Sequence, residues 1–211
     1  MAGGIFEQGR RQYVDVIGYH FYVNTQPPEN MLPIIQQVKQ IMADNGQAAK
    51  PLWNTEIGWL KPSQFASEEL CAAYLARTYI LAWAAGVQRT YWYAWDSGPP
   101  LEMVEHDFRT LKPAGKAYGV IHGWLVGARI NGCRLDANST WTCELNRSGT
   151  AQWIVWNAAG TKKFSVPGQW RAKSFTPLLG DAHAISAGSI EAGPVPVLIT
   201  TTSASARVAS R

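Results

Sequence analysis

Apolar and polar positions follow two different periods along residues 1–127. Three short segments rich in β-branched and aromatic residues are typical of strands: 13–22, 51–59 and 87–95. A longer segment with helical periodicity follows each of them: 31–46, 67–85 and 113–126. Strands that alternate with helices indicate βα units around a parallel sheet. We therefore expect an α/β fold with about three βα units over residues 1–127.

The pattern changes after residue 127 to short alternating segments separated by turn residues. The clearest segments are STWTCEL, AQWIVWN, KKFSVP, a stretch near 171–178, and PVPVLIT. Short alternating strands are typical of an antiparallel β-sandwich, and N-A-A-G at 157–160 predicts a hairpin turn. We expect a small antiparallel β-sandwich domain at 128–200 and a disordered tail at 201–211.

The composition excludes several classes of protein. With 46% hydrophobic and 16% charged residues, the chain can bury a core and is not compositionally disordered. No apolar run approaches the roughly 18–20 residues of a membrane span, and the opening residues lack the apolar middle of a secretory signal. The net charge of +4 is spread without blocks of Lys and Arg. We therefore expect neither a membrane nor a nucleic acid as a partner.

Aromatic residues are abundant, with ten Trp, eight Tyr and six Phe in 211 residues. This number exceeds what packing usually requires, and flat aromatic faces suit the apolar faces of sugar rings. Most of the Trp residues fall on patterned strands or helices, where a place in the core is expected. A carbohydrate is therefore a candidate ligand for the others.

The cysteines and histidines show no spacing typical of a metal site, so we expect no metal and no cofactor. Cys133 and Cys143 are spaced so that two antiparallel strands can place them opposite each other. A disulfide and two unrelated thiols both remain open for this pair. Cys71 lies in a helical pattern and is expected to be a small buried apolar residue.

Glu56 is the most informative residue, because it ends an apolar strand, where a charge is costly unless it is used or paired. Sites in parallel α/β folds are built at the carboxyl ends of strands. His20 and Tyr22 occupy the matching place on the first strand, and Trp92 and Trp95 line or end the third. We expect these side chains to converge at one rim. The alternative for Glu56 is a structural carboxylate paired with Lys or Arg.

Four motifs carry a resemblance to a known family: YHFY at 19–22, WNTEIGW at 53–59, YWYAWDS at 91–97 and KPAGKAY at 112–118. In this order and spacing they resemble strands six to eight of the (β/α)8 glycoside hydrolases of clan A, with families 5 and 39 the most similar. The segments WIVWNAAGT and GPVPVLI are similar to the small β-sandwich that often follows such barrels. The resemblance implies a partial, half TIM-type barrel followed by a β-sandwich.

The resemblance also implies a reaction and a site. Glu56 matches the nucleophile of retaining hydrolysis, which attacks the anomeric carbon and forms a glycosyl-enzyme intermediate. Tyr22 matches the tyrosine that hydrogen-bonds this carboxylate and favours its charged form. His20 matches a polar subsite residue. Trp95, with Trp92, matches the aromatic floor of the subsite next to the scissile bond of an oligosaccharide or polysaccharide substrate.

Two further features flank this site in the sequence. Trp59, in the loop after Glu56, is a candidate for stacking on the substrate, with a place in the core as the alternative. An acidic cluster follows the third strand: Glu102, Glu105, His106 and Asp107. A solvated loop is the favoured interpretation of this cluster, and a substitute catalytic acid is the alternative.

The family's general acid/base, the Glu of an Asn-Glu pair that ends strand four, has no counterpart in the sequence. About 125 residues of βα pattern also fall short of the roughly 250 residues of a full barrel. We therefore expect half of such an enzyme, a truncated reading frame being one explanation. Its open sheet edges predict a homo-oligomer, or pairing with a missing N-terminal piece.

Two functions follow from these residues and motifs. One is a retaining β-glycosidase with Glu56 as the nucleophile, and the other is a non-catalytic barrel fragment that binds carbohydrate or self-assembles. Secretion is typical of the family, which implies an extracellular or periplasmic location. The absent signal peptide leaves the compartment open.

Overall fold

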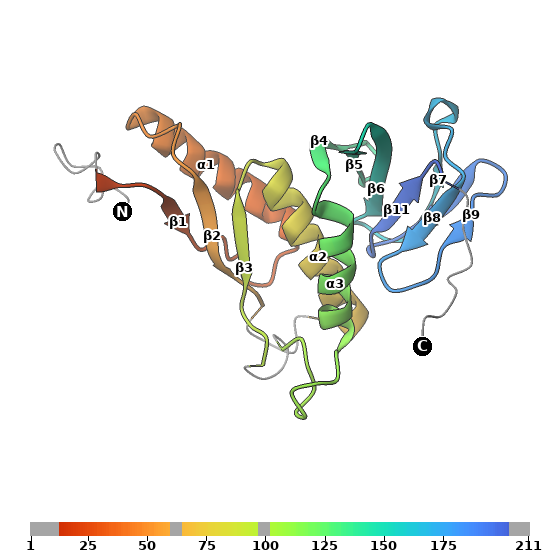
Figure 1. The fold of residues 1–211 in the computed structure, drawn as a ribbon, viewed down its shortest axis with the longest axis horizontal. Helices are drawn as coiled ribbons and strands as arrows, with labels where there is room; N and C mark the ends of the chain where they lie inside the picture. The colour runs from red at the N-terminus through yellow and green to blue at the C-terminus, as the bar shows by residue number, and fades with distance from the viewer. Residues whose placement is uncertain (1–12, 60–64, 97–101, 203–211) are drawn as a thin grey trace.

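The computed structural model describes residues 13–59, 65–96 and 102–202. Within these ranges the chain is a mixed α/β protein, with a parallel sheet and three α-helices followed by antiparallel strands (Figure 1). Residues 1–12 and the part of the predicted tail beyond residue 202 lie outside the described residues.

The parallel sheet has three strands in the order β1-β2-β3. They are β1 (Ile17–Tyr19), β2 (Leu52–Ile57) and β3 (Arg89–Trp92). Each strand is shorter than the apolar segment that predicts it, because only the middle of each segment pairs with a neighbouring strand. The carboxyl ends of all three strands meet at one edge of the sheet, where the predicted site residues follow.

Three helices accompany this sheet: α1 (Met31–Asp44), which follows the short 3-10 helix η3 (Pro28–Asn30), α2 (Glu68–Ala84) and α3 (Pro113–Leu125). Their bounds agree with the predicted helices to within a few residues. Ser67 caps α2, since its side-chain oxygen accepts a hydrogen bond from the Leu70 N–H at 3.2 Å.

Helix α2 is buried on almost every side. It contacts η3, α1, β3, α3 and β4, and Figure 1 shows α2 and α3 between the parallel sheet and the antiparallel strands. Alanines at positions 72, 73, 76 and 82 are almost completely buried. Small side chains at these positions allow neighbouring elements to approach the helix closely.

The antiparallel part consists of a six-stranded sheet in the order β4-β5-β6-β11-β8-β9 and a two-stranded sheet of β7 and β10. The six strands are β4 (Arg129–Leu135), β5 (Thr140–Arg147), β6 (Thr150–Asn157), β11 (Val197–Thr200), β8 (Ser174–Pro177) and β9 (His183–Ala184). The two-stranded sheet pairs β7 (Lys162–Ser165) with β10 (Ser189–Ala192). A short 3-10 helix, η5 (Gly168–Trp170), lies between β7 and β8.

Alternating residues of β6 enter two different cores, because successive side chains of a strand point to opposite faces. Ile154 and Trp156 belong to the large core that also contains the helices and the parallel sheet. Trp153 and Val155 belong to a smaller core with side chains of β7 and β10. The large core is therefore continuous across residue 127, where the sequence pattern changes.

Arg147, the last residue of β5, also joins the two parts of the chain. Its guanidinium donates hydrogen bonds to the backbone oxygens of Gly123 at 2.8 Å, Trp124 at 2.9 Å and Val126 at 2.9 Å. These oxygens lie at the carboxyl end of α3, where the helix dipole favours a cation.

One of the two possibilities for the cysteines is confirmed, and the predicted hairpin is wrong. Cys133 and Cys143 lie opposite each other on β4 and β5 and form a disulfide, and Cys71 is buried in α2. The turn at 157–160 does not form a hairpin, because β7 pairs with β10 instead of β6. A hairpin is found one strand earlier, where Ser148 and Gly149, both with positive φ, connect β5 to β6.

Candidate functional site

Glu56 lies near the carboxyl end of β2 and is partly buried. Tyr22, three residues beyond β1, donates a hydrogen bond from Oη to Glu56 Oε1 at 2.6 Å. Because β1 and β2 are parallel neighbours, their carboxyl ends lie at the same edge of the sheet. The structure therefore brings together the two residues that the sequence placed at this edge.

The surroundings of Tyr22 keep its phenol protonated. Burial raises the pKa of Tyr22 above its usual value, and the hydrogen bond to Glu56, the charge of Glu56 and the nearby Tyr93 raise it further. A protonated phenol is a hydrogen-bond donor, and a hydrogen bond to a carboxylate stabilises its charged form. Tyr22 therefore remains a hydrogen-bond donor to the carboxylate of Glu56.

Asn54 is completely buried two residues before Glu56. In the amide orientation that satisfies both of its ends, its nitrogen donates to the backbone oxygens of Tyr19 at 3.3 Å and Glu56 at 3.0 Å. The pairing of β2 with β3 shifts register between Asn54 and Ile57. Ile57 is consequently buried while its neighbour Glu56 keeps access to the edge of the sheet. The hydrogen bonds of Asn54 thus hold the backbone of Glu56 next to that of Tyr19.

His20 and Tyr93 complete the group around Tyr22. The ring of His20 is exposed and lies 6.2 Å from the ring of Tyr22, measured between centroids. Tyr93, whose N–H donates to the Ile57 oxygen at 2.8 Å, is 43% exposed. Tyr93 is not among the residues predicted from the sequence, although alternation indicates it: Trp92 packs on the core, so the next side chain lies on the opposite face.

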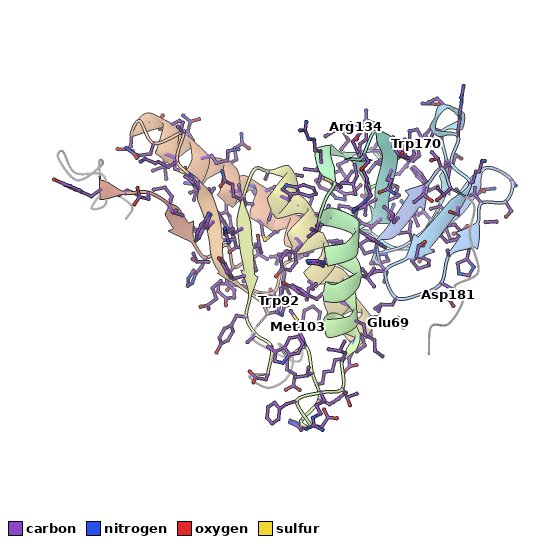
Figure 2. All side chains as sticks on the ribbon, viewed as in Figure 1. Glu69, Trp92, Met103, Arg134, Trp170 and Asp181 are labelled. Carbon is purple, nitrogen blue, oxygen red and sulfur yellow. A yellow bond between two sulfur atoms is a disulfide. The ribbon has the colours of Figure 1, made fainter. Side chains whose placement is uncertain are left out.

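Trp59 and Trp92 do not join this group. Trp59 is only 1% exposed, and its Nε1 donates to the backbone oxygen of Gln26 at 3.1 Å. Its ring packs against Trp92, with 5.7 Å between centroids, and Figure 2 shows Trp92 at the end of β3 nearest the loop that carries Met103. Of the two roles that the sequence leaves open for Trp59, stacking on a substrate and a place in the core, the structure shows the place in the core. Trp92 packs beside it.

Trp95 remains available to a ligand, because 48% of its surface is exposed. Its backbone oxygen accepts a hydrogen bond from Met103 N at 2.8 Å. The buried carboxylate of Glu102 forms an ion pair with Lys112 beside this point. The ion pair connects the loop after β3 to the start of α3. The hydrogen bond from Met103 holds the backbone of Trp95 at the carboxyl edge of the sheet.

The acidic cluster after β3 has structural partners of its own. Asp107 accepts hydrogen bonds from the backbone N–H groups of Arg109 at 2.9 Å and Thr110 at 2.8 Å. The Thr110 hydroxyl and these N–H groups hold the pKa of the exposed Asp107 below its usual value. These contacts agree with the solvated-loop interpretation of Asp107, while Glu102 is buried and paired with Lys112.

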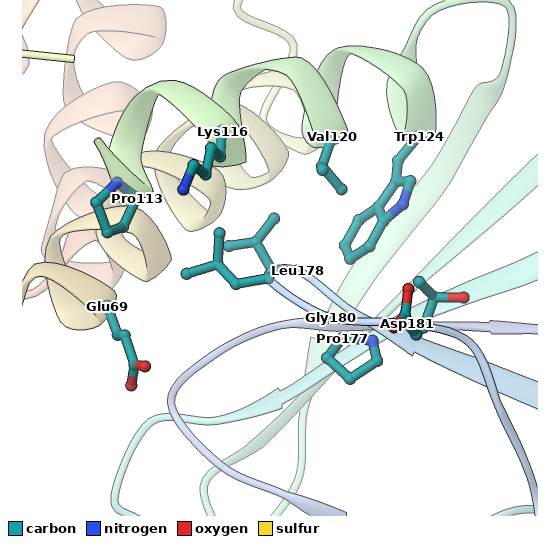
Figure 3. A pocket seen from close by; sticks show the side chains of 11 residues that line it. Glu69, Pro113, Lys116, Val120, Trp124, Pro177, Leu178, Gly180 and Asp181 are labelled. Atoms are coloured by element: carbon teal, nitrogen blue, oxygen red, sulfur yellow. The ribbon is translucent and has the colours of Figure 1, made fainter. Parts of the chain in front are cut away.

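A separate groove of about 520 Å³ lies between α3 and the turn after β8. One wall is a stripe of α3 residues spaced by four, and the other is the segment 176–181 (Figure 3). Its lining residues are Glu69, Pro113, Lys116, Val120, Trp124, Thr176, Pro177, Leu178, Leu179, Gly180 and Asp181. Glu56 and Tyr22 are not among them, so this groove is distinct from the candidate site.

Within the described ranges, no group of three or more His, Cys, Asp and Glu side chains is placed to hold a metal ion. No helix in this part of the chain has the length and apolar character needed to cross a membrane. The side chains gathered at the candidate site are a carboxylate, two phenols, an imidazole and an exposed indole.

Comparisons with known proteins bear on the fold. No protein-family model matches the sequence, and no curated protein matches it. The structure is similar to a glucosidase from Croceicoccus marinus, with a TM-score of 0.63 and 14% identity, over 95% of this chain and 58% of that chain. It is also similar to a GH30 endoxylanase from Clostridium papyrosolvens C71, with a TM-score of 0.56 and 15% identity, over 92% of this chain and 51% of that chain.

Both similar structures are glycoside hydrolases, and the chain spans a little over half of the length of each. The predicted likeness to glycoside hydrolases is thus confirmed for the fold, together with the mixed α/β class. At 14% and 15% identity, the likeness concerns the fold alone.

Proposed function

We propose that this chain is part of a retaining β-glycosidase and that Glu56 is its nucleophile. The observation that carries the proposal is the 2.6 Å hydrogen bond from Tyr22 to Glu56. It lies at the carboxyl edge of a parallel sheet, in a fold similar to that of a glucosidase and an endoxylanase. In this proposal residues 1–127 form half of a TIM-type barrel and residues 128–200 form its β-sandwich.

The reaction begins with the ionised carboxylate. One oxygen of Glu56 attacks the anomeric carbon, and the bond from that carbon to the glycosidic oxygen breaks with its electron pair on the oxygen. A second carboxyl group protonates the departing oxygen. The same group then takes a proton from water, which attacks the glycosyl ester and releases Glu56. Tyr22 holds Oε1 through its hydrogen bond, so Oε2 is the attacking oxygen.

Substrate contacts are assigned to three exposed side chains at the same edge. Trp95 offers an indole face and Tyr93 a phenol, and His20 offers a hydrogen-bonding ring beside Tyr22. An amphipathic sugar ring suits this combination of flat apolar faces and polar groups. Trp92 supports the site from the core.

The second carboxyl group must lie roughly 5–5.5 Å from Glu56 in a retaining enzyme. In the described part of the chain, β1 and β3 each pair only with β2, which leaves two sheet edges open. Exposed Tyr19 and Tyr91 lie on the same sheet, 44% and 45% exposed. We assign the second carboxyl group to the polypeptide that covers these edges, which in a homo-oligomer is another copy of this chain.

Mechanism-based labelling tests the role of Glu56. A 2,4-dinitrophenyl 2-deoxy-2-fluoro-β-glycoside, in its glucose and xylose forms, releases its leaving group without a proton donor. It therefore reports the nucleophile separately from the second carboxyl group. We expect an intact-mass increase of one fluorosugar and peptide mapping of the label to Glu56.

The Glu56→Gln variant should remain unlabelled, whereas Glu105→Gln should be labelled like the unmodified protein, because Glu105 is an exposed carboxylate in the loop after β3. A label on another residue, or equal labelling of Glu56→Gln, contradicts the assignment.

Trp95→Ala and Tyr93→Ala should weaken oligosaccharide binding in calorimetry.

The alternative function is a non-catalytic protein that binds carbohydrate or self-assembles, favoured by the exposed aromatic rings of the open sheet. It predicts oligosaccharide binding that is unchanged in Glu56→Gln and no covalent label. Sedimentation velocity measures the oligomeric state, and thermal unfolding measures whether the chain melts cooperatively. A protein that is monomeric at all concentrations and melts cooperatively argues against the homo-oligomer.

A further inference from the structure

The carboxylate of Glu29 has partners from two distant parts of the fold. It lies in η3, in the loop that follows β1. Arg77 of α2 donates from Nε to Glu29 Oε1 at 2.8 Å and from Nη2 to Oε2. Trp156 of β6 donates from Nε1 to Oε1 at 2.9 Å. Arg77 and Trp156 are 1% and 0% exposed, so the antiparallel sheet holds the loop after β1 through a carboxylate that is only 12% exposed.

The same loop is held at a second point by Trp59. Trp59 follows Glu56 by three residues, and its Nε1 donates to the backbone oxygen of Gln26 at 3.1 Å. Gln26 lies four residues after Tyr22 and three before Glu29. One buried indole therefore ties the segment after Glu56 to the loop that carries Tyr22.

Tyr74 of α2 contacts both Trp59 and Arg77, the residues that hold the loop at Gln26 and at Glu29. Its ring lies edge-on to Trp59, with 5.2 Å between centroids, and the guanidinium carbon of Arg77 lies 5.0 Å from the centre of the same ring. The five side chains are contiguous, and we call them the buried network: Glu29, Trp59, Tyr74, Arg77 and Trp156. The network connects β6 to both segments that form the hydrogen bond of the candidate site.

We propose that the buried network positions the Tyr22 loop against Glu56, with Trp59 and Trp156 acting as positioning residues that do not touch the substrate. The consequence for catalysis rests on the proposed function, whereas the consequence for geometry does not. A hydrogen bond of 2.6 Å exists only while both partners are held closely in place. Supporting hydrogen bonds behind such a pair maintain that placement.

Two substitutions remove single donors while they keep an aromatic ring in the core: Trp59→Phe and Trp156→Phe. The matched control is Trp141→Phe. Trp141 stacks on Trp156 in the same core, at 5.7 Å and 8°, and makes no hydrogen bond to the loop in the described residues. All three variants lose an indole, and only Trp59→Phe and Trp156→Phe lose a hydrogen bond of the buried network.

The first measurement is the NMR signal of tyrosine labelled with 13C at Cζ, which responds to hydrogen bonding of the phenol. The Tyr22 signal is assigned by its absence in Tyr22→Phe. We expect it to shift toward the position of exposed Tyr13 in Trp59→Phe and Trp156→Phe and to stay in place in Trp141→Phe. Stability is measured in parallel, because a purely structural role lowers stability in all three variants without moving this signal.

The second measurement is the rate at which the fluoroglycoside labels Glu56, expected to fall roughly tenfold in both network variants. If neither variant moves the Tyr22 signal, the proposal is overturned, and if one variant fails to fold, the other decides. A shifted signal in a protein that is never labelled leaves the positioning role intact and removes the proposed function. If all variants are labelled at the same rate and the Tyr22 signal does not move, the proposed function stands and the positioning role is overturned.

Discussion

Tyr22 Oη donates a 2.6 Å hydrogen bond to Glu56 Oε1, between segments that follow two neighbouring parallel strands. We predict that Tyr22→Phe slows covalent labelling of Glu56 roughly tenfold to a hundredfold, because a hydrogen bond to a charged group contributes about 1.5–3 kcal/mol. Intact-mass kinetics with the fluoroglycoside measure the rate. Tyr13→Phe, at a side chain that is 77% exposed, is the control. Equal rates in both variants contradict a role for this bond.

The position of this pair could be predicted from the sequence for a physical reason. The βα pattern places Glu56 and Tyr22 at the ends of adjacent parallel strands, and the topology then brings the two ends to one edge. The Ser67 cap is a local feature of the same kind, since it depends on residues three apart.

The burial of Trp59 and the partners of Glu29 could not be predicted in this way. A sequence pattern shows which residues are apolar, and it does not show which distant segment covers them. Arg77 and Trp156 are 48 and 127 residues from Glu29. Trp59 is covered by Tyr74 and Trp92, which belong to later elements.

Stability at alkaline pH should depend on Tyr22 and Tyr79. Burial raises the pKa of both phenols in the folded chain above the usual 10.0. Above about pH 10 the unfolded chain loses protons that the folded chain keeps, so the free energy of unfolding falls as the pH rises. Below that pH this contribution is fully present. Urea unfolding from about pH 8 to about pH 11 should show the decline, and a smaller decline in Tyr22→Phe and Tyr79→Phe than in Tyr13→Phe.

The ion pair of Glu29 and Arg77 should matter most when only one partner is removed. We predict that Arg77→Met lowers the free energy of unfolding by about 3–5 kcal/mol, because it leaves a carboxylate that is only 12% exposed without its cationic partner. Adding Glu29→Gln to Arg77→Met should restore part of the loss, since the remaining group is then neutral. Urea denaturation measures both variants, with Arg129→Ala as an exposed control. A double variant less stable than Arg77→Met would contradict this explanation.

Thiol reactivity should distinguish the three cysteines. Burial raises the pKa of the Cys71 thiol to about 12, so almost no thiolate is present at neutral pH, and the folded protein should resist iodoacetamide. Denaturation without a reductant should add one label, at Cys71, and reduction should add two more at Cys133 and Cys143, as counted by intact mass. Replacing Cys133 and Cys143 by Ala should lower the free energy of unfolding by about 3 kcal/mol, because the disulfide closes a short loop. Three labels before reduction would contradict the pairing across β4 and β5.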